Sequence, residues 1–167
     1  MPEHVTSTIT REHAKLRAAM LEVDTYRLHI DLTDDAVFRV HAVVTFSVSA
    51  GALGHSTCID LLGHDVVSAE LNGKAVPYTD GRLKLADLRA ENELVVTSSA
   101  PYSTTGEGLH RYVDPFDEAE YLYSQCAPAD ARRIFPVFDE PDLNAKFQFR
   151  VTAPAHWDVL SNEPGDC

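Results

Sequence analysis

Residues 121–141 read Y-L-Y-S-Q-C-A-P-A-D-A-R-R-I-F-P-V-F-D-E-P, and this stretch combines three kinds of local structure. Its first five residues are rich in tyrosine and predict a strand that ends at Gln125. The run A-D-A-R-R predicts a helical turn, and Phe135 and Phe138 flank Pro136, which predicts a turn pinned into the core. Such an order of elements suits a β-rich domain with one buried, ordered connection.

The charged residues of this stretch favour architecture over catalysis. Arg132 lies at helical spacing to reach Asp139 or the carbonyl groups of the turn, and the D-E-P run predicts a tight turn. Two neighbouring carboxylates suggest acid–base chemistry in principle, but adjacent residues of an extended turn point apart. We therefore expect a structural role for the signature residues, which are Arg132, Phe135, Phe138, Asp139, Glu140 and Pro141.

Outside this stretch, apolar and polar residues alternate over long runs. The runs that begin at Tyr26 and at Phe38 predict two half-buried strands joined by the turn T-D-D-A. If Leu32 and Phe38 both face the core, Asp31 opposes Arg39 and His29 opposes His41. The Asn72-Gly73 pair predicts a tight hairpin. Further strands are expected near residues 57–61, 66–71, 82–85, 93–97, 146–152 and 157–160.

These short, closely spaced strands predict a mainly β fold, an antiparallel sandwich or saddle-like sheet, with a short N-terminal helix. We expect that helix over residues 11–21, with Ala14, Ala18 and Leu21 on its apolar stripe and Arg17 off it. The polar stretch 98–108, S-S-A-P-Y-S-T-T-G-E-G, is expected to be a mobile loop. The predicted domain organisation is a helix and lead-in over 1–22, a β-domain over 23–162 and a tail over 163–167.

Charge and hydropathy restrict the partners. The net charge of −12 repels phosphate backbones, so no nucleic-acid partner is expected. No segment has the length of a signal peptide or a membrane span, so we expect no membrane partner and a cytoplasmic location. Three cysteines lack metal-ligand spacing. Cys58 and Cys126 are interpreted as small core residues, and Cys167 as an exposed thiol.

Four segments together resemble the N-terminal β-domain of the M1 family of zinc aminopeptidases, in its actinobacterial aminopeptidase N type. They are A-R-R-I-F-P-V-F-D-E-P (131–141), the strand that ends at Gln125, G-E-G-L-H-R-Y (106–112) and V-T-A-P-A-H-W-D-V-L-S-N (151–162). The resemblance implies that Gln125 lines the pocket for the first side chain of a peptide substrate. A structural role at the edge of the strand ladder is the alternative for this residue.

The resemblance also exposes a departure at Ala127. The family usually has Glu or Gln there, which helps to hold the free α-amine of the substrate, whereas alanine offers neither a charge nor an acceptor. Loss of one charge-assisted hydrogen bond costs about 1.5–3 kcal/mol in a desolvated site. Amine recognition would then rest on groups elsewhere, or this copy is not a working aminopeptidase.

The zinc motif of the family, H-E-x-x-H, occurs nowhere in these residues, and neither does its G-x-M-E-N strand. The resemblance implies a cleft-capping domain of a zinc-dependent aminopeptidase that releases N-terminal amino acids from peptides. Its partners would be peptide substrate and a catalytic domain of the same or another chain, which would hold the zinc. The chain alone is expected to be inert and to expose a large apolar docking surface. A stand-alone interaction or scaffold module, and a decayed gene fragment, are the alternatives.

Other groupings favour less specialised roles. His29 and His41 face each other in the expected register, but only Asp31 offers a third metal ligand, so a solvated sheet face is preferred. Ser124 lies in a strand without the glycines of a nucleophile elbow. His110 is interpreted as a surface residue, with contact to substrate or a neighbouring domain as the alternative.

Overall fold

The protein is mainly β, as the sequence predicts, in the computed structural model, which describes residues 11–163 and 165. One α-helix precedes the strands. In chain order the elements are α1 (Arg11–Met20), β1 (Leu21–Asp31), β2 (Val37–Val48), η1 (Ala50–Ala52), β3 (Thr57–Asp60), β4 (Asp65–Leu71), β5 (Lys74–Ala75), β6 (Tyr78–Thr79), β7 (Arg82–Leu85), β8 (Glu91–Pro101), β9 (Gly108–Val113), β10 (Glu120–Gln125), η2 (Ala131–Arg133) and β11 (Lys146–Thr152).

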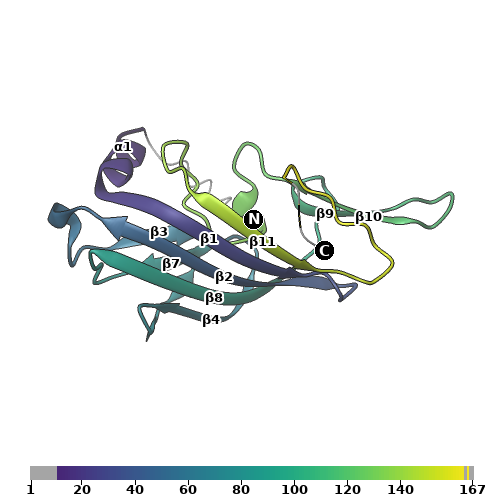
Figure 1. Cartoon of the computed structure of the whole chain (residues 1–167), viewed down its shortest axis with the longest axis horizontal. Coiled ribbons are helices and arrows are strands. Elements are labelled where there is room, and N and C mark those ends of the chain that lie inside the picture. Colours follow the sequence, from purple (N-terminus) through teal and green to yellow (C-terminus); the bar gives the residue numbers. More distant parts are fainter. Residues whose placement is uncertain (1–10, 164, 166–167) are drawn as a thin grey trace, which may run out of the picture.

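The strands form three sheets. The largest has the order β11-β1-β2-β8-β4-β5, in which β1 and β11 are parallel and the other neighbours are antiparallel. A second sheet, β3-β7-β6, lies behind the large one, and the hairpin β9–β10 projects beyond its end (Figure 1). The antiparallel sandwich predicted from the sequence is therefore confirmed, with one parallel edge strand added.

The core lies between the large sheet and the layer formed by β3, β7 and the segment after η2. Alternation in β1 and β2 places one set of side chains inside, which includes Tyr26, Leu28, Phe38 and Val44. Period-two alternation has this effect because successive side chains of a strand point to opposite faces. The second layer contributes Ile59, Leu61, Leu83, Leu85, Phe135 and Phe138.

The predicted register of the first hairpin is confirmed. Asp31 pairs with Arg39, and His29 pairs with His41. The Asn72-Gly73 pair joins β4 to β5, and both residues have positive φ, 53° and 79°. That geometry is the one that a two-residue hairpin turn requires, and asparagine and glycine adopt it at low cost.

Three local predictions were wrong. Strand β8 runs to Pro101, because residues 98–101 pair with β2, so the expected loop begins later. Residues 157–160 form no strand, and no neighbouring strand in the described part of the chain offers them a ladder. Leu21 opens β1 instead of ending the helix, and Arg17 points inward, because it meets a buried carboxylate that sequence spacing does not reveal.

The cysteines are less buried than expected. Cys58 is half-buried and Cys126 is exposed, so Cys126 is not the core residue that the sequence suggested. Cys167 lies outside the described residues. No helix within residues 11–163 is long and apolar enough to cross a membrane. The division of the chain at residues 22 and 162 stays a prediction.

Candidate functional site

Three backbone hydrogen bonds hold the segment that follows β10 against the sandwich. Asp60 and Val137 exchange two of them, at 3.1 and 3.0 Å, and the Leu62 N–H donates to the carbonyl of Arg132 at 2.7 Å. Residues 134–138 are buried as a result. This segment therefore forms a rigid base for the strand end that precedes it.

The two phenylalanines of the segment lie in the core. The ring of Phe138 meets Phe46 edge to face at a centroid distance of 5.3 Å, and Phe135 lies 6.4 Å from Tyr26. The Phe138 N–H donates to the Tyr26 hydroxyl at 3.0 Å. Since Tyr26 belongs to β1, this contact ties the segment to the centre of the large sheet.

The charged groups of the D-E-P turn are only partly satisfied by hydrogen bonds. Arg132 Nε, Asp139 Oδ2 and Glu140 Oε2 are buried without a partner among the described residues. Burial raises the pKa of Asp139, and the nearby Arg132 charge partly offsets this effect, although no ion pair within 4 Å joins the two. The partner of Glu140 is Arg17 from α1. Sequence reasoning missed Arg17, because nothing local to the turn indicates it.

His64 is a second buried residue that the sequence did not single out. Its ring lies 3.0 Å from the hydroxyl of Ser98 and 3.0 Å from the carbonyl oxygen of Arg133. The ring therefore joins the large sheet to η2. Burial lowers the pKa of His64 to about 4, so the imidazole is neutral near pH 7.

Gln125 closes strand β10 and its side chain is exposed. Its Nε2 lies 3.4 Å from the carbonyl oxygen of Ala127, and in the ladder Gln125 pairs with Gly108. Arg133 packs over Gly108, so closely that a Cβ on this glycine would lie 2.9 Å from the Cβ of Arg133. Gln125 is thus a polar side chain on a firmly supported strand end, and Ala127 beside it is exposed.

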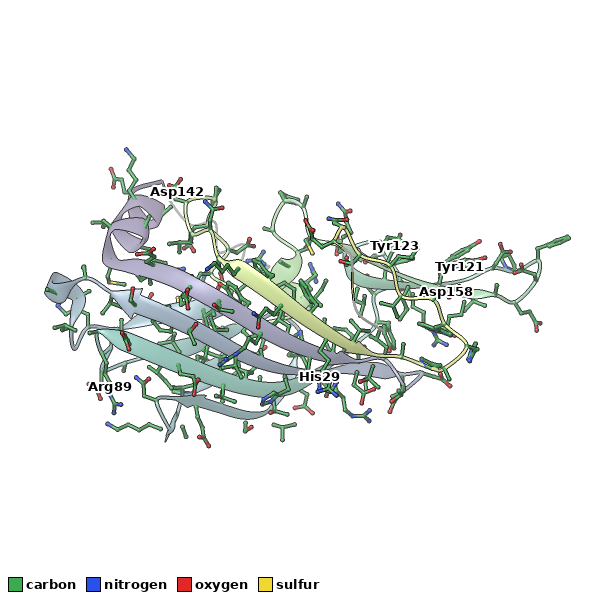
Figure 2. All side chains as sticks on the ribbon, in the orientation of Figure 1. His29, Arg89, Tyr121, Tyr123, Asp142 and Asp158 are labelled. Atoms are coloured by element: carbon green, nitrogen blue, oxygen red, sulfur yellow. The ribbon has the colours of Figure 1, made fainter. Side chains whose placement is uncertain are left out.

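The projecting hairpin carries aromatic rings next to Gln125. His110 pairs with Tyr123 and their ring centroids are 4.8 Å apart, and Tyr112 pairs with Tyr121 at 6.5 Å. Tyr121 and Tyr123 lie on the hairpin beyond the end of the large sheet (Figure 2). The side chains on this surface can form hydrogen bonds and apolar contacts with a ligand. Such contacts bind a ligand but do not cleave a bond in it.

The donor set does not fit a metal ion. Within the described ranges, 11–163 and 165, no three His, Cys, Asp or Glu side chains come together in a way that could hold one. His29 and His41 each bond to a threonine instead, at 2.9 Å to Thr152 and 3.2 Å to Thr97. We therefore derive no metal-dependent step from the residues of this chain.

An open groove lies on the outer face of the large sheet and is lined mostly by polar side chains. The lining includes Glu22, Asp24, Arg27, Asn72 and Glu93. None of the predicted site residues belongs to it. The exposed end of β10 is therefore the better candidate for a functional site.

A β-sandwich in which the buried segment 134–138 supports an exposed strand end defines a class of domain. Residues 23–166 match the family model described as the Peptidase M1 N-terminal domain, and the chain belongs to this family. It is 43% identical over 166 residues to aminopeptidase N of Streptomyces lividans, across 95% of this chain and 19% of that protein. It is 26% identical over 145 residues to probable aminopeptidase 1 of Sulfurisphaera tokodaii, across 87% and 18%.

Solved structures share the fold. An M1 zinc metallopeptidase from Deinococcus radiodurans, bound to a Tyr-Ser-Ala substrate, superposes with a TM-score of 0.62 at 23% identity. The match covers 79% of this chain and 32% of that one. The chain spans only about a fifth of the length of the curated relatives named above. No H-E-x-x-H motif occurs in its 167 residues, so the catalytic domain of the family is absent from this chain.

Proposed function

We propose that this chain is the cleft-capping N-terminal domain of a zinc-dependent aminopeptidase that releases N-terminal amino acids from peptides. In this role Gln125 lies beside the pocket for the first side chain of the substrate. The observation that supports the proposal best is the exposed amide of Gln125 at the end of a strand whose support is rigid. Its ladder partner Gly108 is packed under Arg133, and the segment beyond is buried.

Exposed apolar side chains support a partner domain. Phe147 and Phe149 of β11 lie on the core-facing side of the large sheet, in register with Tyr26 and Leu28, yet they are 45% and 54% exposed. Tyr121 and Tyr123 of the hairpin are also about half exposed. Apolar surface of this extent marks an interaction site in a water-exposed domain. We assign these two surfaces to contact with the catalytic domain.

Ala127 favours a second candidate function, a non-catalytic interaction module. Its exposed methyl group stands where the family usually places an amine-binding Glu or Gln. No group at this position balances the ammonium of a substrate. The same apolar surfaces would then bind a different protein, and the domain would not need to recognise a substrate amine.

The native protein, isolated from its source cells with an antibody against this chain, tests the first proposal. We expect a polypeptide with a mass several times 18.4 kDa that contains zinc and hydrolyses leucine p-nitroanilide. Gln125→Ala should raise its KM, whereas Gln148→Ala, on the outer face of β11, should not. A zinc-free native protein of 18.4 kDa without activity would overturn the aminopeptidase proposal and leave the interaction module.

A further inference from the structure

A buried ion pair joins helix α1 to the signature turn. Arg17 Nη1 bonds to Glu140 Oε1, and the exposed fractions of the two side chains are 13% and 2%. Arg17 Nη2 also lies 3.3 Å from the sulfur of Cys58. The helix ends before residue 23, where the match to the family model begins, whereas Glu140 belongs to the signature turn. A lead-in helix therefore supplies the counter-charge for the most deeply buried carboxylate of the turn.

We infer that α1 is a releasable clasp, held closed by the Arg17–Glu140 ion pair, whose opening frees the signature turn and uncovers Cys58. This inference does not depend on the proposed aminopeptidase function, because it concerns contacts within this chain alone.

The apolar contacts of α1 are too few to hold it without the ion pair. Leu16 is 68% exposed, and Ala14 and Ala18 are only half-buried. Among the helix side chains that the structure describes, Met20 alone packs against the core, and its carbonyl accepts a hydrogen bond from the Ser49 N–H at 2.9 Å. A ten-residue helix has little stability of its own in water, so its order depends on docking.

Because the ion pair is buried, its loss destabilises the closed state of the clasp. Removal of one partner from a buried pair leaves an uncompensated charge, and Glu140 already has one oxygen, Oε2, without a partner. Arg82 is paired with Asp60 at 2.8 Å, so it is not free to replace Arg17. Without Arg17 the turn therefore opens toward water instead of keeping a bare buried carboxylate.

Acid alone does not release the clasp. Burial raises the pKa of the Glu140 carboxyl above its usual 4.5, and the charge of Arg17 opposes that rise. In the open, solvated state the pKa of this carboxyl is lower than in the closed state, so the closed state binds a proton more tightly and a fall in pH does not favour opening. The charged or titratable groups that face this carboxyl from neighbouring elements are Arg17, Asp60, Asp139, Arg82 and Tyr26. Asp60 and Asp139 raise its pKa further, because they are like charges.

Accessibility of Cys58 reports the state of the clasp. In a chain with Cys126→Ser and Cys167→Ser, Cys58 is the single thiol, and its reaction with 4,4′-dithiodipyridine is followed by absorbance. We expect Arg17→Met to raise the labelling rate near neutral pH by about tenfold or more, because the closed state loses a buried pair. Glu140→Gln should raise it less, and Arg17→Lys should restore much of the protection. Lys15→Met, at an exposed position of the same helix, is the matched control and should change nothing.

Hydrogen exchange separates opening of the clasp from general unfolding. In the unaltered chain at about pH 7.5, residues 11–20 should exchange through openings that are more frequent than those of β2. Thiol labelling of Cys58, normalised to the denatured chain, should give the same opening equilibrium as exchange in α1. This measurement needs no variant, so it decides the matter even if Arg17→Met fails to fold. Exchange of α1 no faster than that of β2 would overturn the inference, as would equal labelling of the Arg17→Met and Lys15→Met chains.

Discussion

The hydroxyl of Tyr26 accepts a hydrogen bond from the backbone N–H of Phe138 at 3.0 Å, and 112 residues separate the two in sequence. Both residues are buried, at 1% and 2% exposure. Burial also keeps the pKa of Tyr26 well above its usual 10, so the phenol stays protonated. This contact joins the first strand of the large sheet to the segment that supports Gln125.

Replacement of Tyr26 by phenylalanine should destabilise the protein by about 1–3 kcal/mol, because the buried N–H of Phe138 would lose the acceptor that it has among the described residues. Urea unfolding followed by circular dichroism measures this change. Tyr112→Phe, at an exposed position of the hairpin, serves as the control and should alter stability by less than about 0.5 kcal/mol. Equal stability of the Tyr26→Phe chain would show that Phe138 finds another acceptor.

Gly108→Ala should cost about 1–3 kcal/mol, because the new Cβ would press on Arg133 at 2.9 Å and the backbone has a φ of +66°. Gly51→Ala, where a Cβ meets nothing within 4 Å, provides the comparison and should be nearly neutral. Thermal unfolding of both variants tests the point. A destabilisation no larger than that of Gly51→Ala would mean that the hairpin is not fixed at Gly108.

Stability should fall between about pH 6.5 and pH 4 because of His64. Its pKa is lowered from 6.5 to about 4 in the folded state, so as the pH falls the unfolded chain binds a proton first. The contribution that is lost amounts to roughly 3 kcal/mol at full extent. Urea unfolding across this interval should show a smaller decline in His64→Gln than in the unaltered chain.

His29→Gln is the control for this pH dependence, since His29 lies on the outer face of the large sheet and its hydrogen-bond partner among the described residues is Thr152. Its stability profile should follow that of the unaltered chain. A His64→Gln chain with an undiminished decline would place the titrating group elsewhere.

Ala127→Glu should strengthen binding of substrates with a free α-amine, if the proposed role of this strand end is correct. In the longer aminopeptidase that the proposal requires, we expect KM to fall by about tenfold or more, the equivalent of one charge-assisted hydrogen bond. Ala127→Leu tests whether size alone matters and should give no gain. An unchanged KM in Ala127→Glu would indicate that the amine is held entirely by the catalytic domain.

The sequence predicted the sandwich because alternation of period two is a local property. In each strand the alternation shows which face is buried. In the first hairpin the requirement that Leu32 and Phe38 both face the core also predicts the pairing register. Residues 157–160 show the limit of this reasoning. Their pattern fits a strand, but a strand exists only where a partner completes its hydrogen bonds, and no partner is present in the described part of the chain.

The residues of the candidate site were also predicted only in part. Resemblance to the M1 family led to Gln125, Ala127 and the signature turn, and the roles of these residues stay predictions. No sequence pattern indicated the supports of the site, such as His64 under η2 or Arg133 over Gly108. These contacts join residues that are 25 to 69 positions apart, as the Gly108–Arg133 and His64–Arg133 pairs illustrate.

By itself the sequence determined the fold class, the family and the absence of a zinc motif, because each of these is written in local patterns of residue type. The tertiary structure alone decided which charges are buried and what neutralises them. Glu140 in an acidic turn looks like a solvated residue, yet it is 6% exposed and paired with Arg17, 123 positions earlier. The free energy of a charge depends on its distance from water and from other charges, and only the folded chain sets those distances.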